Sequence, residues 1–151
     1  MAHSFSFELT RQSSAPPEVV FSVLADVPRW QEWAGPFVRR SSWEREGTPA
    51  PGGVGAIRKV GAPPVFAREE IVAYDPPHGL SYVLRSGMPL REYRADVSVT
   101  SSSSGSGGSD IVWRGKFTPR FRGTGAALRA FLVFTVGRLA RGLATYAESS
   151  R

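Results

Sequence analysis

The sequence has no cysteine and only two histidines among its 151 residues. The absence of cysteine excludes disulfides, thiolate catalysis and zinc–cysteine sites, and it agrees with the cytoplasmic location that we expect. His3 lies near the N-terminus and His78 lies in a proline-rich turn, so neither indicates a metal site or a Ser–His–Asp triad. The chain also has no P-loop, no G-x-S-x-G motif and no dinucleotide-binding fingerprint. We therefore expect neither a metal nor a cofactor.

Long apolar runs are also missing. No run approaches the ~18 residues of a membrane span, so we expect no transmembrane helix. The first ten residues alternate between polar and apolar side chains, which is not the pattern of a signal peptide. Hydrophobic residues nevertheless make up 41% of the chain, enough for a folded core. The length predicts a single domain over residues 1–151.

Acidic residues are outnumbered by basic ones, which gives the chain a net charge of +6 and a pI of about 10.5. Such a basic balance is typical of proteins with anionic partners. The cations are spread from Arg11 to Arg151 and form no dense block. All except Lys59 and Lys116 are arginine, which indicates a bias of the coding genome. We therefore expect no nucleic-acid partner.

The longest regular pattern occupies residues 122–151. At 100° per residue, one face carries a mostly apolar set: Leu128, Phe131, Leu132, Thr135, Val136, Leu139, Gly142, Leu143 and Tyr146. The opposite face carries Ala130, Gly137, Arg141 and Glu148. This predicts one amphipathic helix that begins after Gly123, with Thr124 as its N-cap. Some 23 residues at 1.5 Å each extend roughly 34 Å, enough to cross a small sheet. No other stretch keeps the helical period for so long, so we expect the rest of the chain to be a sheet packed on this helix.

The remaining chain alternates mostly as strands do. We expect a strand over residues 4–10, a short helix that starts near residues 16–18 and is ended by residues 26–28, and one further turn near 29–33. Six more strands are expected at residues 37–46, 54–60, 65–74, 80–84, 93–99 and 111–117. Tight turns predict an antiparallel meander, and the Ser/Gly-rich residues 101–109 predict a flexible hairpin loop. The order predicts an α+β fold in which a curved antiparallel sheet of about seven strands wraps around the long C-terminal helix.

Four short motifs follow one another along the chain: A-P-P-E-V-V-F at residues 15–21, D-V-P-R-W-Q-E-W at 26–33, G-V-G at 53–55 and D-P-P-x-x-L at 75–80. Together with the amphipathic last helix, their order resembles the START-like or Bet v 1-like superfamily (SRPBCC), which includes the polyketide cyclase/dehydrase and lipid transport family. The resemblance implies a helix-grip fold. Members bind lipids, steroids, polyketides and plant metabolites, and only some are enzymes.

A cavity between sheet and helix is expected from the aromatic side chains that face the helix. These rings could also fill an ordinary core, but the resemblance favours the wall of an apolar binding site. The residues that we expect to line it are Trp33, Phe37, Arg58, Glu69, Tyr82, Tyr93, Trp113, Phe117, Leu128, Phe131, Leu132 and Thr135.

The polar members of this set follow from strand parity. Arg58 faces inward if Val54, Ala56 and Val60 do, and Glu69 faces inward if Val65, Ala67 and Ile71 do. A bulge would turn Arg68 or Glu70 inward in place of Glu69. If Arg58 and Glu69 are both inward, they should pair with each other or meet a polar ligand group, because an unpaired buried charge is costly. The alternative is that both face solvent.

Three functions agree with these patterns. The first is a carrier or sensor that binds a small hydrophobic molecule, such as a lipid or polyketide. The second is an aromatase/cyclase-like enzyme acting on a polyketide, in which Arg58, Glu69 and Tyr93 hold enol oxygens or move protons. The third is a protein-interaction module with a filled interior. A connected cavity of roughly 300 Å³ or more would favour ligand binding over the third function.

The exposed side of the last helix allows a further contact. Val133 and Phe134 lie off the predicted core face beside Arg138 and Arg141. They could form a peripheral membrane-contacting patch or a dimer patch. We expect a monomer or a homodimer.

Overall fold

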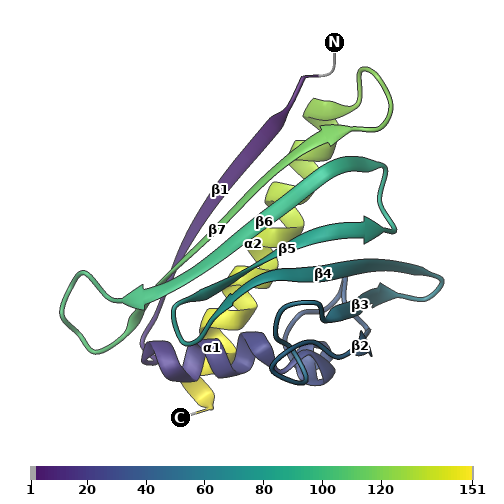
Figure 1. Ribbon diagram of the computed structural model, residues 1–151. Helices are drawn as coiled ribbons and strands as arrows, with labels where there is room; N and C mark the ends of the chain where they lie inside the picture. Colours follow the sequence, from purple (N-terminus) through teal and green to yellow (C-terminus); the bar gives the residue numbers. More distant parts are fainter. Residues whose placement is uncertain (1–2, 151) are drawn as a thin grey trace.

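The computed structural model describes residues 3–150 and contains a seven-stranded antiparallel sheet that curves around a long helix (Figure 1). This confirms the α+β helix-grip fold that the sequence predicts. Within the described residues, no helix is both long enough and apolar enough to span a lipid bilayer. In chain order the elements are β1 (Phe5–Ser13), α1 (Pro17–Ala25), the 3-10 helix η1 (Val27–Glu32), β2 (Arg40–Arg45), β3 (Ile57–Ala62), β4 (Val65–Asp75), β5 (Gly79–Ser86), β6 (Leu90–Ser101), β7 (Ser109–Pro119) and α2 (Gly125–Ser149).

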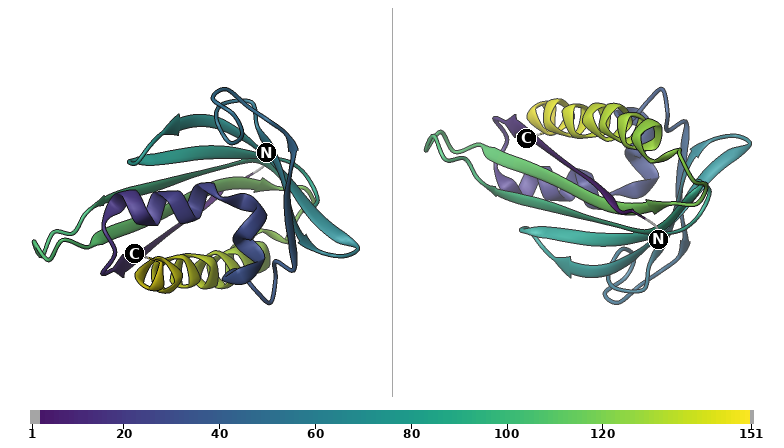
Figure 2. Two further views of the ribbon diagram at one scale, coloured as in Figure 1. Left: turned by 90° about the horizontal axis from the view of Figure 1, so that it is seen from below. Right: turned by 90° about the horizontal axis from the view of Figure 1, so that it is seen from above.

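The sheet order β1-β7-β6-β5-β4-β3-β2 places the first two strands at opposite edges. Strands β2 to β7 form the expected meander, and β1 pairs antiparallel with β7. The chain crosses from one edge to the other through α1 and η1. Figure 2 shows α1 and α2 on the same side of the curved sheet. The helices therefore cover one face of the sheet, and the alternating exposed residues lie on the other.

Helix α2 is attached to one side of the sheet. It packs against β1, β7 and α1. The Ser13 hydroxyl of β1 donates a hydrogen bond of 2.8 Å to the Ala144 carbonyl of α2. At the start of the helix, the Phe5 ring occupies the place that a side chain at position 125 would take, so the residue there is Gly125. Strands β3 and β4 belong to the other half of the sheet and face α2 across a cavity.

The buried face of α2 is rotated from the predicted one. Leu132, Val136 and Leu143 are buried as expected, but Phe131 is 49% exposed. Gly137, which the periodicity places on the outer side, is buried against β1. Thr124 is the N-cap residue, yet its hydroxyl donates to the Phe121 carbonyl instead of capping the helix. The periodicity therefore locates the helix correctly and its contact face only partly.

Two glycines of α2 give a matched test of this packing. A Cβ at Gly142 would lie 2.5 Å from the backbone oxygen of Trp33, whereas at Gly137 it would lie 3.3 Å from the flexible Arg11 guanidinium. We expect Gly142→Ala to lower the free energy of unfolding by about 1–3 kcal/mol, because backbone must move. Gly137→Ala should raise it by up to about 1 kcal/mol through helix propensity. Urea denaturation measures both, and equal stability of the two variants would contradict the close contact at Trp33.

Of the two parities left open for β3 and β4, the structure has the one that turns Arg58 and Glu69 inward. Arg58 is 1% exposed and Glu69 is 6% exposed. Val54 and Val65 are exposed, contrary to the prediction, because Val54 precedes β3 and Val65 lies at the tip of the β3–β4 hairpin. The β4–β5 register does shift beside Glu69, but the shift leaves this carboxylate inside.

The remaining differences concern the ends of strands. The strand expected at 37–46 begins at Arg40, and the strand expected at 54–60 is Ile57–Ala62. Strands β6 and β7 continue into the Ser/Gly-rich segment, so the loop spans residues 102–108. Ser109 is fully buried, and its hydroxyl donates a 2.7 Å hydrogen bond to the Ala15 carbonyl. The base of this hairpin is therefore anchored next to α1, and flexibility of the loop itself stays a prediction.

Candidate functional site

A cavity of about 340 Å³ lies between α2 and strands β3, β4, β5 and β6. Its wall is mostly apolar, and its charged or hydroxyl side chains are Glu69, Tyr82, Tyr93 and Thr135. The size is within the range of small-molecule sites, which begins at about 300 Å³. The complete lining is Pro36, Phe37, Val38, Val60, Gly61, Ala62, Val65, Ala67, Glu69, Tyr82, Gly87, Met88, Tyr93, Phe131, Leu132, Thr135, Val136 and Leu139.

The structure brings together seven of the twelve side chains that the sequence places at the cavity. These are Phe37, Glu69, Tyr82, Tyr93, Phe131, Leu132 and Thr135. They come from β4, β5, β6, α2 and the segment before β2. Residues far apart in sequence therefore form one surface.

The other five predicted residues do not line this cavity. Arg58 and Trp113 are buried behind Glu69 and Tyr82, to which they donate hydrogen bonds. Phe117 packs between the rings of Phe5 and Tyr93, at centroid distances of 5.7 and 6.5 Å. Trp33 packs on Trp30, with ring centroids 5.2 Å apart, and lines other hollows. Leu128 lies near the start of α2, outside the lining. Parity places a side chain on the inner face, but not beside a particular space on it.

Several lining residues were missed as site residues. Val60 and Ala67 alternate with Arg58 and Glu69, so strand parity already pointed to them. Val136 was expected on the helix core face but not at the cavity. Met88 lies in the turn between β5 and β6, where no periodic pattern is available.

A buried ion pair holds the carboxylate of the cavity wall. Arg58 and Glu69 are directly opposite in the β3–β4 ladder, and Arg58 Nε donates to Glu69 Oε1 at 2.8 Å. The Arg58 guanidinium lies 4.5 Å from the ring centroid of Trp30 and 4.2 Å from that of Tyr82. Its Nη1 is buried without a hydrogen-bond partner among the described residues. The rings of Trp30 and Tyr82 thus hold the guanidinium of Arg58, and Arg58 in turn holds the carboxylate of Glu69.

Two tyrosines add hydroxyl groups beside this carboxylate. Trp113 Nε1 donates to the Tyr82 hydroxyl at 3.1 Å, and the Tyr82 and Tyr93 rings meet edge to face. Burial, followed by the negative charge of Glu69, raises the pKa of Tyr82 to about 12. Burial, followed by the neighbouring Tyr82 and Glu69, raises the pKa of Tyr93 well above 10. Both hydroxyls therefore stay protonated near neutral pH.

Thr135 is the polar group that α2 contributes. Its hydroxyl is 3.4 Å from the Leu132 carbonyl of the same helix, the long end of the hydrogen-bonding range. This back-bonding is the arrangement usual for a threonine inside a helix. The weak bond leaves the hydroxyl able to turn toward a molecule in the cavity.

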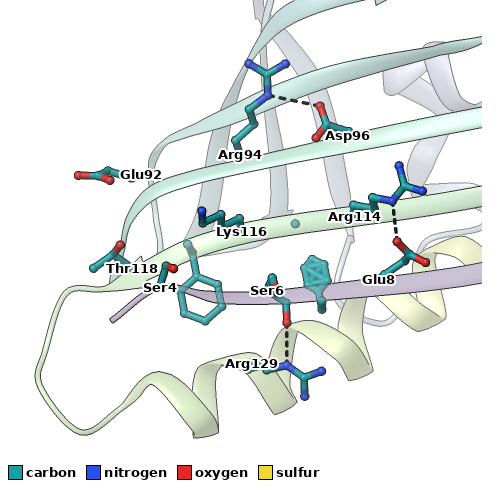
Figure 3. Close-up of a pocket in the computed structure, with 13 residues that line it drawn as sticks. Ser4, Ser6, Glu8, Glu92, Arg94, Asp96, Arg114, Lys116, Thr118 and Arg129 are labelled. Atoms are coloured by element: carbon teal, nitrogen blue, oxygen red, sulfur yellow. Dashed lines mark hydrogen bonds and ion pairs between the residues drawn. The ribbon is translucent and has the colours of Figure 1, made fainter. Parts of the chain in front are cut away.

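A second, larger hollow of about 960 Å³ lies on the solvent side of the sheet (Figure 3). Four of its charged side chains form two ion pairs: Arg114 Nε lies 2.6 Å from Glu8 Oε1, and Arg94 Nε lies 3.3 Å from Asp96 Oδ1. Such exposed pairs are typical of a solvated sheet face. Within residues 3–150, no group of three histidine, aspartate or glutamate side chains is arranged to hold a metal ion.

Comparisons with known proteins agree with this architecture. The family described as "Polyketide cyclase / dehydrase and lipid transport" matches residues 4–148. The crystal structure of Ara h 8.0201 has a TM-score of 0.75 to this chain at 18% identity, covering 98% of this chain and 100% of that one. No curated protein matches by sequence. Because the family match extends from β1 through α2, the chain belongs to the polyketide cyclase/dehydrase and lipid transport family.

Proposed function

We propose that this protein binds a small hydrophobic molecule, such as a lipid or polyketide, in the cavity between α2 and the sheet. The observation that carries the proposal is the mostly apolar cavity of about 340 Å³. This volume exceeds the roughly 300 Å³ at which small-molecule sites begin. The family also includes proteins of lipid transport. A protein-interaction module would need no such space.

The arrangement of the wall supports a ligand with one polar end. Phe37, Leu132 and Leu139 offer apolar contacts, while Glu69 can accept and Tyr93 can donate a hydrogen bond. A hydroxyl or enol group would match this pair. A pure hydrocarbon would form no hydrogen bond with the carboxylate and hydroxyl groups of the wall.

The polar groups favour binding over catalysis. Glu69 is the single carboxylate on the wall and is already paired with Arg58. Tyr82 and Tyr93 keep their protons, so neither is a base at neutral pH. An aromatase/cyclase-like reaction would have to use Glu69 as its base while this residue remains bound to an arginine. We therefore propose a carrier or sensor as the primary function and the enzyme as the alternative.

A cavity-filling variant tests the proposal. A panel of fatty acids, sterols and aromatic polyketides should contain compounds that raise Tm, because a ligand at 100 times its Kd adds about 2.7 kcal/mol. Ala67→Trp should abolish this shift, since residue 67 lines the cavity. Ala130→Trp is the matched control, because Ala130 is exposed on α2. A panel without any shift, or shifts that Ala67→Trp leaves unchanged, would contradict binding at this site.

A further inference from the structure

Three phenylalanines are gathered at the surface where α2 meets the segment before β2. The Phe37 ring meets Phe131 and Phe134 edge to face, at centroid distances of 6.3 and 5.8 Å. Phe131 is 49% exposed and Phe134 is 57% exposed. We call these three residues the phenylalanine rim. Phe37 and Phe131 also line the cavity, so the rim borders its opening.

An arginine-lined hollow of about 610 Å³ adjoins the rim. Phe134 lines it together with Arg11, Arg138 and Arg141, and no acidic side chain is among its described lining residues. None of these three arginines forms an ion pair within residues 3–150. Arg11 Nη1 is held by the Thr10 carbonyl at 2.9 Å. This hollow, which we call the arginine hollow, therefore concentrates uncompensated positive charge beside exposed aromatic rings.

Most of α2 carries no negative charge. Its residues 125–147 contain three arginines and no aspartate or glutamate. This contrasts with the solvent side of the sheet, where Arg94 pairs with Asp96 and Arg114 pairs with Glu8 (Figure 3). A basic patch with neighbouring aromatic and aliphatic side chains is complementary to an anionic, partly apolar surface.

We propose that the phenylalanine rim and the arginine hollow dock the protein on an anionic lipid bilayer. The phenyl rings enter the interfacial layer, and Arg11, Arg138 and Arg141 bind lipid phosphates. Because the rim borders the cavity, docking brings the cavity opening to the membrane. The proposal goes beyond ligand binding, which requires no membrane. A second copy of the chain is a poorer occupant, since a two-fold contact would bring like-charged arginines together.

Vesicle co-sedimentation tests the charge requirement. The protein is mixed with phosphatidylcholine vesicles, or with vesicles in which a third of this lipid is replaced by phosphatidylglycerol. We expect binding to the anionic vesicles alone, and the variant Arg138→Gln/Arg141→Gln should bind about 30-fold more weakly. The control Arg91→Gln/Lys116→Gln removes two exposed cations of β6 and β7 that form no ion pair within residues 3–150, and it should bind as the wild type does. Equal binding by the two variants, or binding to neutral vesicles, would overturn the proposal.

A site-specific label tests the orientation. The chain has no cysteine, so Ala130→Cys gives a single attachment point on the exposed side of α2 without removing a phenylalanine. A polarity-sensitive fluorophore there should shift to the blue with anionic vesicles. The same label at Thr100→Cys, on the outer side of β6, should not shift. A shift at position 100 alone would contradict the proposed orientation. Dimer formation in place of vesicle binding would overturn membrane docking and identify the rim and hollow as a contact between two copies. The Tm assay for ligand binding uses no vesicles, so its result does not depend on whether the protein docks on a membrane.

Discussion

Replacing Glu69 with leucine is expected to lower the free energy of unfolding by about 3–5 kcal/mol. The substitution leaves the Arg58 guanidinium buried without its anion, in a place where only the rings of Trp30 and Tyr82 remain beside it. Arg58→Met should have a comparable effect, because it strands the carboxylate of Glu69. Urea denaturation of each variant measures the loss.

The double variant Arg58→Met/Glu69→Leu shows whether the losses in the single variants come from the broken ion pair itself or from the charge that each leaves buried alone. When both charges are replaced by apolar side chains of similar size, the stability should return close to that of the wild type, because neither buried charge is left alone. Glu44→Gln is the control: it breaks the Arg68–Glu44 pair of similar length, but both partners are 40% exposed, so the loss should stay below about 1 kcal/mol. Additive losses in the double variant would contradict this account of the pair.

Raising the pH from 10 to above 12 is expected to destabilise the fold by about 3 kcal/mol through Tyr82 alone. The folded protein holds this proton more tightly than the unfolded chain does, because burial raises the pKa of Tyr82 to about 12 from an ordinary value of 10. The stabilisation is therefore complete below pH 10 and is lost as the pH rises through 12. Tyr93, whose pKa is also raised by burial, adds to the loss.

Ultraviolet absorbance of tyrosinate, recorded beside urea denaturation, checks this prediction. Tyr82 and Tyr93 should ionise only as the protein unfolds. Tyr82→Phe should reduce the dependence between pH 10 and 12 to the part that Tyr93 contributes. Ionisation of Tyr82 and Tyr93 near pH 10 in a folded protein would contradict the burial of the pair.

The fold was largely predictable because its elements have clear periods, but the orientation of α2 was not. Hydrophobic periodicity gives weight to large side chains, so it assigned Phe131 to the core and Gly137 to the surface. In the structure Phe131 is half-exposed at the edge of the cavity and Gly137 is buried, since the small residues Gly137 and Ala144 allow α2 to approach β1 closely. Where the backbones of α2 and β1 approach closely, small residues with little hydrophobicity become buried. Hydrophobic periodicity does not detect such residues, because it responds to large apolar side chains.

The candidate site was predictable from strand parity only in part. Parity left Arg58 and Glu69 either inward, where they would pair with each other or meet a ligand, or outward in solvent, and the structure has them inward and paired. Parity could not tell that Trp113 and Phe117 lie where other side chains fill the interior, while Tyr82 and Tyr93 border the space. That distinction depends on how far α2 lies from each strand. The distance follows from the curvature of the sheet, which arises from the whole set of strand pairings rather than from any one segment.

The one-sided attachment of α2 has a mechanical consequence. The helix is anchored along β1 and β7, and the β3–β4 hairpin faces it over an empty span. The middle of β3 is held to the helical layer through Arg58, which packs on Trp30 of η1, so the exposed tip of the β3–β4 hairpin at Val65 is the part of this wall with the least packing. A bulkier guest would be accommodated by moving this tip outward, whereas the same displacement at β1 would separate the packing that keeps the helix in place.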